Sequence, residues 1–137
     1  MIYTKVIPIE FNHCDPAGIV FYPRYFEMIN SVVENFFADV VGRSFAQMHS
    51  VLPYTGVPTV RIEANFAAPS RLGEKVEFAL QVVRIGASSL AMVITARHHE
   101  QPRLQVDLTV VWTCGGRATR WPAVLRATLL AFQEDVT

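Results

Sequence analysis

Apolar residues recur at steps of three and four positions over one long stretch of the chain, Arg24–Val41. Polar and charged residues lie between the apolar ones, which are Tyr25, Phe26, Ile29, Val32, Val33, Phe36, Phe37 and Val40. This spacing predicts a single helix with a wide buried face. Pro23 suits its first position, and Gly42 suits the residue after its last turn. At 1.5 Å per residue the helix would span roughly 27 Å, enough to cross a small sheet.

Most of the remaining chain alternates apolar and polar residues with a period of two, as half-buried strands do. A first strand is expected over Tyr3–Phe11, where Pro8 fits only an edge or a bulge. Four longer strands are expected around residues 60–66, 76–82, 90–96 and 104–112, the last two joined by a turn at Glu100-Gln101-Pro102. Short turns between long strands favour a strongly curved antiparallel sheet. The pattern therefore predicts an α+β fold in which a sheet packs on the long helix.

Two other segments have a weaker pattern. Residues Gly42–Pro58 lack a clean period and contain several prolines, so we interpret them as a loop with a short helix near Phe45–His49. Residues Pro122–Gln133 predict a helix that begins at the proline. No repeat or linker divides the sequence, so residues 1–137 are expected to form a single domain.

Composition limits the partners of this domain. Twelve basic residues balance twelve acidic ones, which argues against a general attraction to nucleic acid or to an anionic membrane. No stretch has the length of a membrane span and the N-terminus lacks a signal-peptide pattern, so we expect a cytoplasmic protein. Cys14 and Cys114 form no CxxC or zinc pattern. Apolar residues make up 51%. Several of them lie at strand positions expected to face away from the helix, which indicates a subunit interface; these are Val83, Ala91, Val93 and Val111.

Residues His13–Met28 are the stretch in which chemistry is expected. Asp15 lies in a turn formed with Pro16 and Gly18, directly before the long helix. An aspartate in a turn is most often a turn former or a helix cap. Here, however, the carboxylate would be partly removed from water, next to free backbone N–H groups that can face an oxyanion, those of Phe21, Tyr22, Arg24 and Tyr25. Asp15 is therefore the leading candidate for a catalytic carboxylate.

The histidines and the first cysteine give weaker signals. His13 either orients Asp15 or forms a local hydrogen bond near the turn. Cys14 has no necessary base partner and is interpreted as an inert thiol. His98 and His99 lie at an expected strand end and face opposite sides, which favours solvated side chains over a metal site. We predict no metal.

The turn after the second long strand is a candidate anion site. Arg84 precedes it, and the hydroxyls of Ser88 and Ser89 follow Gly86. Arg61 is a second candidate, although a single arginine is more often a solvated surface charge. The sequence contains neither GxxxxGK[ST] nor GxGxxG, so the Walker and Rossmann modes of phosphate binding are excluded.

The residues Asp15-Pro16-Ala17-Gly18-Ile19-Val20-Phe21-Tyr22-Pro23-Arg24-Tyr25 resemble the signature of the aspartate-type hotdog acyl-CoA thioesterases, the 4-hydroxybenzoyl-CoA thioesterase family. The resemblance extends to the order of elements over nearly the whole chain, including the stretch 66–73 and the turn 86–89. It implies a hotdog fold, in which a curved antiparallel sheet wraps a long central helix. It also implies a homodimer with active sites at the subunit interface, and two such dimers are expected to form a homotetramer. No cofactor is expected.

The resemblance implies roles for individual residues as well. Asp15 would attack the thioester or activate water, and the backbone N–H of Tyr22 would polarise the thioester carbonyl. Substrate contacts are expected from His13, Gly18, Pro58, Arg84, Ser88 and Ser89. Two positions differ from the 4-hydroxybenzoyl-specific relatives: the turn at Arg84 lacks their run of basic residues, and His13 replaces an acidic residue.

The expected chemistry suits these residues, because a thioester carbonyl is electrophilic and its thiolate leaves readily. We expect hydrolysis of acyl-CoA thioesters that carry aromatic or short acyl groups. One alternative is action on acyl carrier protein thioesters, which requires a docking patch for an acidic partner, at Arg24, Arg43, Arg61 or Arg84. The other alternative is a non-catalytic hotdog subunit that binds an acyl-CoA.

Overall fold

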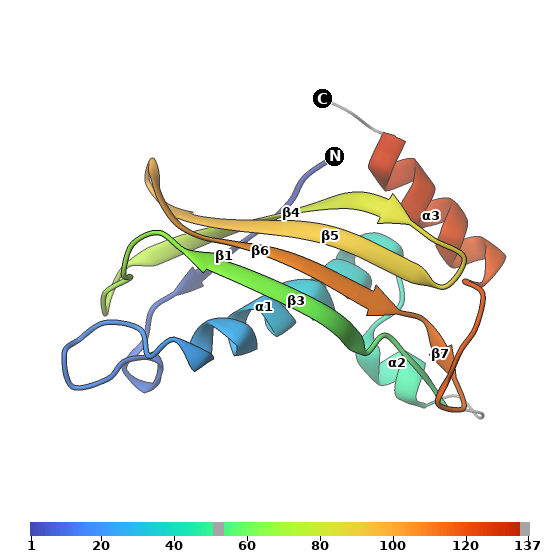
Figure 1. Cartoon of the computed structure of the whole chain (residues 1–137), viewed down its shortest axis with the longest axis horizontal. Coiled ribbons are helices and arrows are strands. Elements are labelled where there is room, and N and C mark those ends of the chain that lie inside the picture. Colours follow the sequence, from blue (N-terminus) through green and yellow to red (C-terminus); the bar gives the residue numbers. More distant parts are fainter. Residues whose placement is uncertain (51–53, 135–137) are drawn as a thin grey trace.

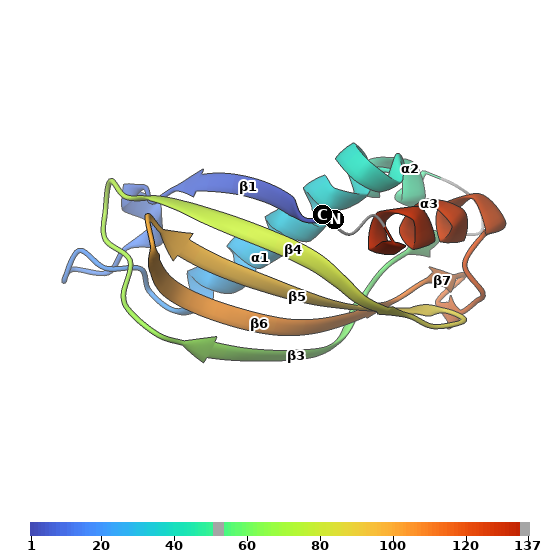
Figure 2. The same ribbon diagram turned by 90° about the horizontal axis from the view of Figure 1, so that it is seen from above.

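A five-stranded antiparallel sheet curves over one long helix, and the core lies between these two layers (Figures 1 and 2). The computed structural model describes residues 1–50 and 54–134. The strands lie in the order β1-β4-β5-β6-β3, and their bounds are Tyr3–Pro8 (β1), Thr59–Phe66 (β3), Lys75–Ile85 (β4), Ser89–His98 (β5) and Gln101–Val111 (β6). All neighbouring pairs are antiparallel, and β1 and β3 form the two edges.

The central helix α1, Pro23–Phe36, packs against one face of this sheet. Its buried residues are Tyr25, Met28, Ile29, Val32, Val33 and Phe36. The facing strands bury every second residue, as in Val76, Phe78 and Leu80 of β4 and Leu90, Met92 and Ile94 of β5. The two periodicities of the sequence thus correspond to two faces of one core. The prediction of a curved antiparallel sheet around a long helix is confirmed.

The helix changes geometry at its C-terminal end. Residues Phe37–Val41 form a π-helical turn, which Gly42 ends with a φ of 82°. Phe36 and Phe37 are consecutive and yet both fully buried, which the wider turn permits. On this turn, Asp39 Oδ2 accepts a 2.6 Å hydrogen bond from the Tyr3 hydroxyl of β1. Burial, together with this hydrogen bond, raises the pKa of Tyr3 to about 12.

Shorter elements lie around these layers. The helix α2, Phe45–His49, follows the π-helical turn, and a small sheet in the order β2-β7-β8 comprises Thr55–Gly56, Thr113–Cys114 and Arg117–Ala118. The helix α3, Ala123–Glu134, packs against β4 and the π-helical turn (Figure 1). The short helix near Phe45 and the C-terminal helix were both predicted. The predicted loop 42–58 includes residues 51–53, which lie outside the described residues.

Two predicted boundaries are wrong. The first strand ends at Pro8 because a 3-10 helix follows at Phe11–His13, although β1 does lie at an edge, as its proline requires. The strand β6 begins at Gln101, so the turn lies at His99 and Glu100. His99 adopts a φ of 55° there, and the pairing register shifts between Ala96 and Arg97, which accommodates Pro102 in the strand.

Candidate active site

Asp15 lies in a tight hairpin, residues 14–20, between β1 and α1. Its N–H donates to the Ile19 carbonyl at 3.0 Å, and its own carbonyl accepts from the Gly18 N–H at 3.0 Å. Gly18 has a φ of 78°, a conformation that favours glycine. The half-buried Asp15 side chain accepts a 2.9 Å hydrogen bond from the Ala17 N–H at Oδ1. Its own turn therefore fixes the carboxylate, while Oδ2 has no hydrogen-bond partner among the described residues.

The start of α1 follows the hairpin directly and leaves one backbone N–H free. The Phe21 N–H donates to the His13 carbonyl at 2.9 Å, the Arg24 N–H to Phe21 at 2.8 Å and the Tyr25 N–H to Tyr22 at 3.1 Å. In the part of the chain that the structure describes, the Tyr22 N–H has no acceptor. Of the four N–H groups that the sequence made candidates, Tyr22 is therefore the one available to an oxyanion.

His13 forms the local hydrogen bond that was one of its two expected roles. It closes the 3-10 helix Phe11–His13, where its Nδ1 accepts from the Glu10 N–H at 2.8 Å and its own N–H donates to the Glu10 carbonyl at 3.0 Å. The Cys14 thiol faces the Glu10 carbonyl at 3.5 Å. His13 is thus engaged with the segment before the hairpin, not with the Asp15 carboxylate. Its contact with substrate stays a prediction, as does that of Gly18.

A loop between β3 and β4, residues 67–74, lies against the Asp15 hairpin. The Val20 N–H donates to the Ser70 carbonyl at 2.9 Å, and the Leu72 N–H donates to the Gly18 carbonyl at 3.1 Å. These two bonds join the hairpin to the loop like a short piece of antiparallel sheet. The position of Asp15 therefore depends on a segment about fifty residues further along the chain.

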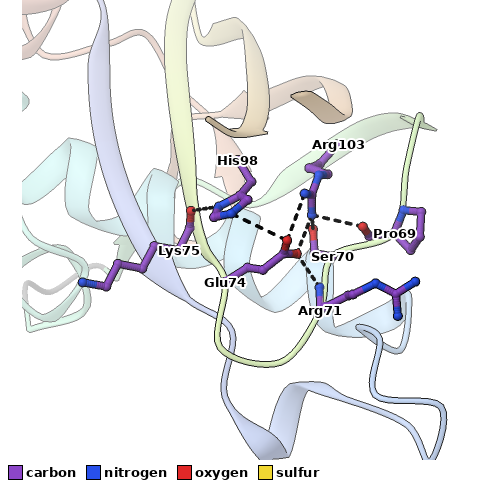
Figure 3. A network of polar contacts seen from close by, with 7 residues as sticks. All are labelled: Pro69, Ser70, Arg71, Glu74, Lys75, His98 and Arg103. Atoms are coloured by element: carbon purple, nitrogen blue, oxygen red, sulfur yellow. Dashed lines mark hydrogen bonds and ion pairs between the residues drawn. The ribbon is translucent and has the colours of Figure 1, made fainter. Parts of the chain in front are cut away.

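A partly buried ion pair holds this loop in place (Figure 3). The guanidinium of Arg103, which is only 4% exposed, donates to both Glu74 carboxylate oxygens at 2.7 and 3.2 Å. Its Nη1 also donates to the Ser70 hydroxyl at 3.1 Å and to the Pro69 carbonyl at 3.0 Å. Glu74 accepts in addition from the Arg71 N–H at 2.6 Å. The hydrogen bonds from Arg103 lower the pKa of Glu74 to about 2.

His98 also belongs to this network, so the prediction of a solvated side chain is wrong for it. Its Nδ1 lies 2.8 Å from the Lys75 carbonyl, which makes this nitrogen the donor, and Nε2 lies 3.6 Å from Glu74 Oε2. Arg103 and Glu74 were not among the residues predicted from the sequence. Arg103 lies one residue before the predicted strand 104–112, so no alternation of apolar and polar residues distinguishes it from a surface arginine.

The turn that carries Ser88 and Ser89 lies at the other end of the sheet (Figure 2). The whole length of β4 separates it from the loop beside Asp15, which corresponds to roughly 35 Å along the strand. The carbonyl of Ser89 accepts from the Trp121 indole at 3.0 Å, and Arg84 is exposed. One chain therefore does not bring these predicted substrate contacts together with Asp15.

Unpaired arginines surround this turn. A pocket of about 270 Å³ is lined by Ile85, Gly86, Ala87, Arg120, Trp121 and Arg126, and Arg126 donates to the Gly86 carbonyl at 2.7 Å. The sequence contains no Asp or Glu from residue 108 to residue 133. Accordingly, Arg84, Arg120 and Arg126 form no salt bridge within the described ranges. This end of the sheet is a local concentration of positive charge on a chain with no formal net charge.

A groove of about 590 Å³ opens beside Pro58, at the start of β3. Its lining combines aromatic, aliphatic and polar side chains, among them Asn30, Val33, Phe45, His49, Tyr54 and Thr59. The far end of β3 lies near Asp15 instead, because the Phe66 ring packs against those of Tyr22 and Tyr25. The groove and the Asp15 hairpin therefore lie at opposite ends of the same edge strand.

Residues 1–50 and 54–134 contain neither a cluster of metal-ligand side chains nor a membrane-spanning helix. No three His, Cys, Asp or Glu side chains lie together as metal ligands would. None of the helices in these ranges is both long and apolar enough to cross a membrane.

Comparisons with known proteins place the chain in a family. Residues 9–129 match the family model of the thioesterase-like superfamily, whereas no curated protein matches the sequence. Among solved structures, an Asp-to-Asn mutant of 4-hydroxybenzoyl-CoA thioesterase, complexed with 4-hydroxybenzoyl-CoA, superposes with a TM-score of 0.85 at 21% identity, covering 93% of this chain and 98% of that one. A 1,4-dihydroxy-2-naphthoyl-CoA thioesterase from Synechocystis gives 0.83 at 16% identity, with 95% and 96% covered.

A structure solved with bound CoA is also similar in fold to this chain. A hypothetical protein from Staphylococcus aureus, solved with CoA, superposes with a TM-score of 0.91 at 11% identity, over 100% of this chain and 87% of that chain. The predicted hotdog fold and the predicted class of enzyme, a thioester hydrolase, are confirmed at the level of the family. The chain belongs to the thioesterase-like superfamily.

Proposed function

We propose that the protein hydrolyses acyl-CoA thioesters, with Asp15 as the catalytic carboxylate and the Tyr22 N–H as the oxyanion donor. The observation that carries this proposal is the free Tyr22 N–H at the start of α1, which directly follows the turn that fixes the Asp15 carboxylate, while the N–H groups of Phe21, Arg24 and Tyr25 are already bonded. The donor also lies at the start of a fourteen-residue helix, where the helix dipole favours negative charge. A thioester needs no more than these two groups.

Two routes lead from this arrangement to the products. In the first, an Asp15 oxygen attacks the thioester carbon, the C–S bond breaks, and the CoA thiolate leaves and takes a proton from water. Water then hydrolyses the mixed anhydride, which releases the acid and restores the carboxylate. In the second, Asp15 accepts a proton from a water molecule whose oxygen attacks the same carbon, the C–S bond breaks, and the leaving CoA thiolate takes the proton from Asp15. Both routes place negative charge on the thioester oxygen, which the Tyr22 N–H stabilises.

For the acyl group we propose an aromatic or short chain. A groove of about 590 Å³ is large enough for a ring, and its lining includes the aromatic side chains of Phe45, His49 and Tyr54. Two proteins with this fold are named as thioesterases of 4-hydroxybenzoyl-CoA and 1,4-dihydroxy-2-naphthoyl-CoA, which are aromatic substrates. These names support the substrate class for this chain without selecting one acid.

For the nucleotide end of CoA we propose the arginine-rich end of the sheet. Arg84 and Arg120 have no carboxylate partner in the described ranges, and the N–H groups of Ala87 and Ser88 have no acceptor there. Guanidinium groups and consecutive free N–H groups are suited to phosphate oxygens. The serine hydroxyls of the same turn would add neutral contacts.

A homodimer would join these parts into one site. The edge strand β3 exposes apolar side chains, with Val60 at 61%, Ile62 at 41% and Phe66 at 49%. If two copies of β3 paired antiparallel about Ile62, Arg61 of one copy would face Glu63 of the other. The same pairing would bring the groove at Pro58 of one subunit to Asp15 of its partner. A homotetramer would then form through the outer sheet face that carries Val83 and Val93.

A thiol-release assay tests the proposal. The wild type should release CoA from aromatic or short acyl-CoAs, whereas Asp15→Asn should bind the same esters and turn over at least about a thousandfold more slowly. Glu100→Gln, at the exposed turn before β6, is the matched control and should retain activity. Near wild-type turnover by Asp15→Asn would refute the role of Asp15. Faster release from acyl carrier protein esters would favour that substrate, and binding without release would identify a non-catalytic subunit.

A further inference from the structure

We infer that Arg103 is a positioning residue for the Asp15 hairpin, acting through its ion pair with Glu74. The inference rests on the proposed function, because the hairpin matters only if Asp15 is the catalytic carboxylate. Arg103 itself is buried and belongs to β6. It therefore cannot act by touching substrate.

The hairpin has few other supports. Besides the bonds within its own turn, it is joined to the loop 67–74 by the Val20–Ser70 and Gly18–Leu72 backbone bonds. The segment before the hairpin is joined to the end of the same loop, where the Ile9 N–H donates to the Glu74 carbonyl at 2.8 Å and the Ile9 carbonyl accepts from the Gly73 N–H at 2.9 Å. The loop thus holds the chain on both sides of Asp15.

The loop in turn depends on Arg103. Residues 67–74 belong to none of the helices or longer strands, so few bonds of regular structure fix them. The Arg103 carbonyl accepts from the Ala67 N–H at 2.8 Å, and its guanidinium bonds Pro69, Ser70 and Glu74 near the other end. Arg103, a single residue of β6, therefore contacts the loop at its start, in its middle and at its end.

A tyrosine of α1 acts on the charge of the same arginine. The Tyr25 hydroxyl, three residues after Tyr22, is buried without a hydrogen-bond partner within the described residues, as is Arg103 Nε. The tyrosine raises the pKa of Arg103 further, in addition to the effect of Glu74. Loss of Arg103 would disturb the loop that supports the hairpin. Because a shift of about 1 Å in a catalytic group costs on the order of a hundredfold in rate, the effect should appear in kcat.

The test replaces the whole ion pair, because removing one partner leaves a buried charge and risks unfolding. The variant is Arg103→Met with Glu74→Met, and its matched control is Arg97→Met with Glu77→Met, an exposed cross-strand pair of the same residue types with a 3.0 Å contact. We expect the Arg103–Glu74 variant to lose about tenfold or more in kcat with KM within about twofold. The control should keep both constants. Unchanged kcat in the first variant would overturn the inference.

A second measurement does not depend on activity. Amide hydrogen exchange at Val20 and Leu72 reports the two backbone bonds that join the hairpin to the loop. Exchange there should accelerate in the Arg103–Glu74 variant and stay slow in the control; unchanged protection would refute the inference. If the double variant does not fold, Arg103→Lys, which keeps both charges and removes the forked guanidinium, takes its place in both experiments. A wild type without thioesterase activity would refute the proposed function, while amide exchange would still decide the role of Arg103.

Discussion

The rings of Tyr22 and Phe66 meet edge to face with their centroids 6.4 Å apart, and this contact joins the last residue of β3 to the start of α1. The side chain of Tyr22 is 61% exposed, so its packing is limited to such edge contacts. Its backbone N–H is the group to which we assign a role. The two functions of this residue can therefore be separated by mutation.

Tyr22→Pro removes the N–H and should lower kcat by about a hundredfold or more, as the loss of an oxyanion donor does. Proline is compatible with the Tyr22 backbone, whose φ is −52°. Tyr22→Ala keeps the N–H and removes the ring, so its kcat should stay close to that of the wild type. Thiol-release kinetics on both variants, with circular dichroism as a check on folding, would show the contrast. A large loss in Tyr22→Ala would instead assign the role to the side chain.

The ion pair of Glu74 predicts a specific loss of stability in acid. Its pKa is lowered from 4.5 to about 2, so the folded state binds a proton less readily than the unfolded state. The pair therefore stabilises the fold above about pH 4.5, and this stabilisation is lost as the pH falls towards 2. Glu74→Gln should be less stable than the wild type by about 2 kcal/mol near pH 6, with the difference shrinking below pH 4.5. Denaturant unfolding at several pH values measures this, and a difference independent of pH would contradict it.

The arginine-rich end of the sheet predicts a substrate effect confined to the nucleotide. Arg120→Gln should raise KM for an acyl-CoA by about tenfold, because the loss of one charge-assisted hydrogen bond weakens binding by about that factor. KM for the matching pantetheine thioester, which lacks the nucleotide, should not change. Arg97→Gln, whose side chain pairs with Glu77 on the sheet, serves as the control. Equal effects on both thioesters would place the nucleotide elsewhere.

The proposed dimer can be tested at its edge strand. Ile62→Arg, on β3, should give a monomer in analytical ultracentrifugation and lose most of its activity, because the groove would no longer lie beside Asp15 of another subunit. Val6→Arg, on the opposite edge strand β1, changes a residue of similar exposure, 51% against 41%. This control should stay dimeric and active. An active Ile62→Arg monomer would show that one chain contains the whole site.

Much of the fold was predictable because burial in each element is periodic. The face of α1 that carries Val32 and Phe36 and the alternation in β4 and β5 follow directly from two spacings. The signature beginning at Asp15 likewise indicated which segment to examine. The structure then reduced four candidate N–H groups to that of Tyr22, since hydrogen bonds to neighbouring carbonyls engage the other three.

Other features depend on neighbours that are remote in sequence. The bond from Arg103 to Pro69 joins residues 34 positions apart, and no local pattern distinguishes a buried arginine of this kind from a solvated one. His98 is bound by Lys75 and Glu74 for the same reason. The sequence has no acidic residue between positions 108 and 133, but only the fold brings Arg120 and Arg126 to the turn at Gly86.

The π-helical turn at Phe37–Val41 makes the register of the central helix sensitive to insertion and deletion. Deleting one residue within it would allow the α-helical repeat to continue, and every later residue of the helix would rotate by about 100°. Asp39 would then turn away from Tyr3, to which it is now hydrogen-bonded, and the buried Val41 would leave the core. The length of this segment, more than its composition, is thus what ties the first strand to the far end of the helix.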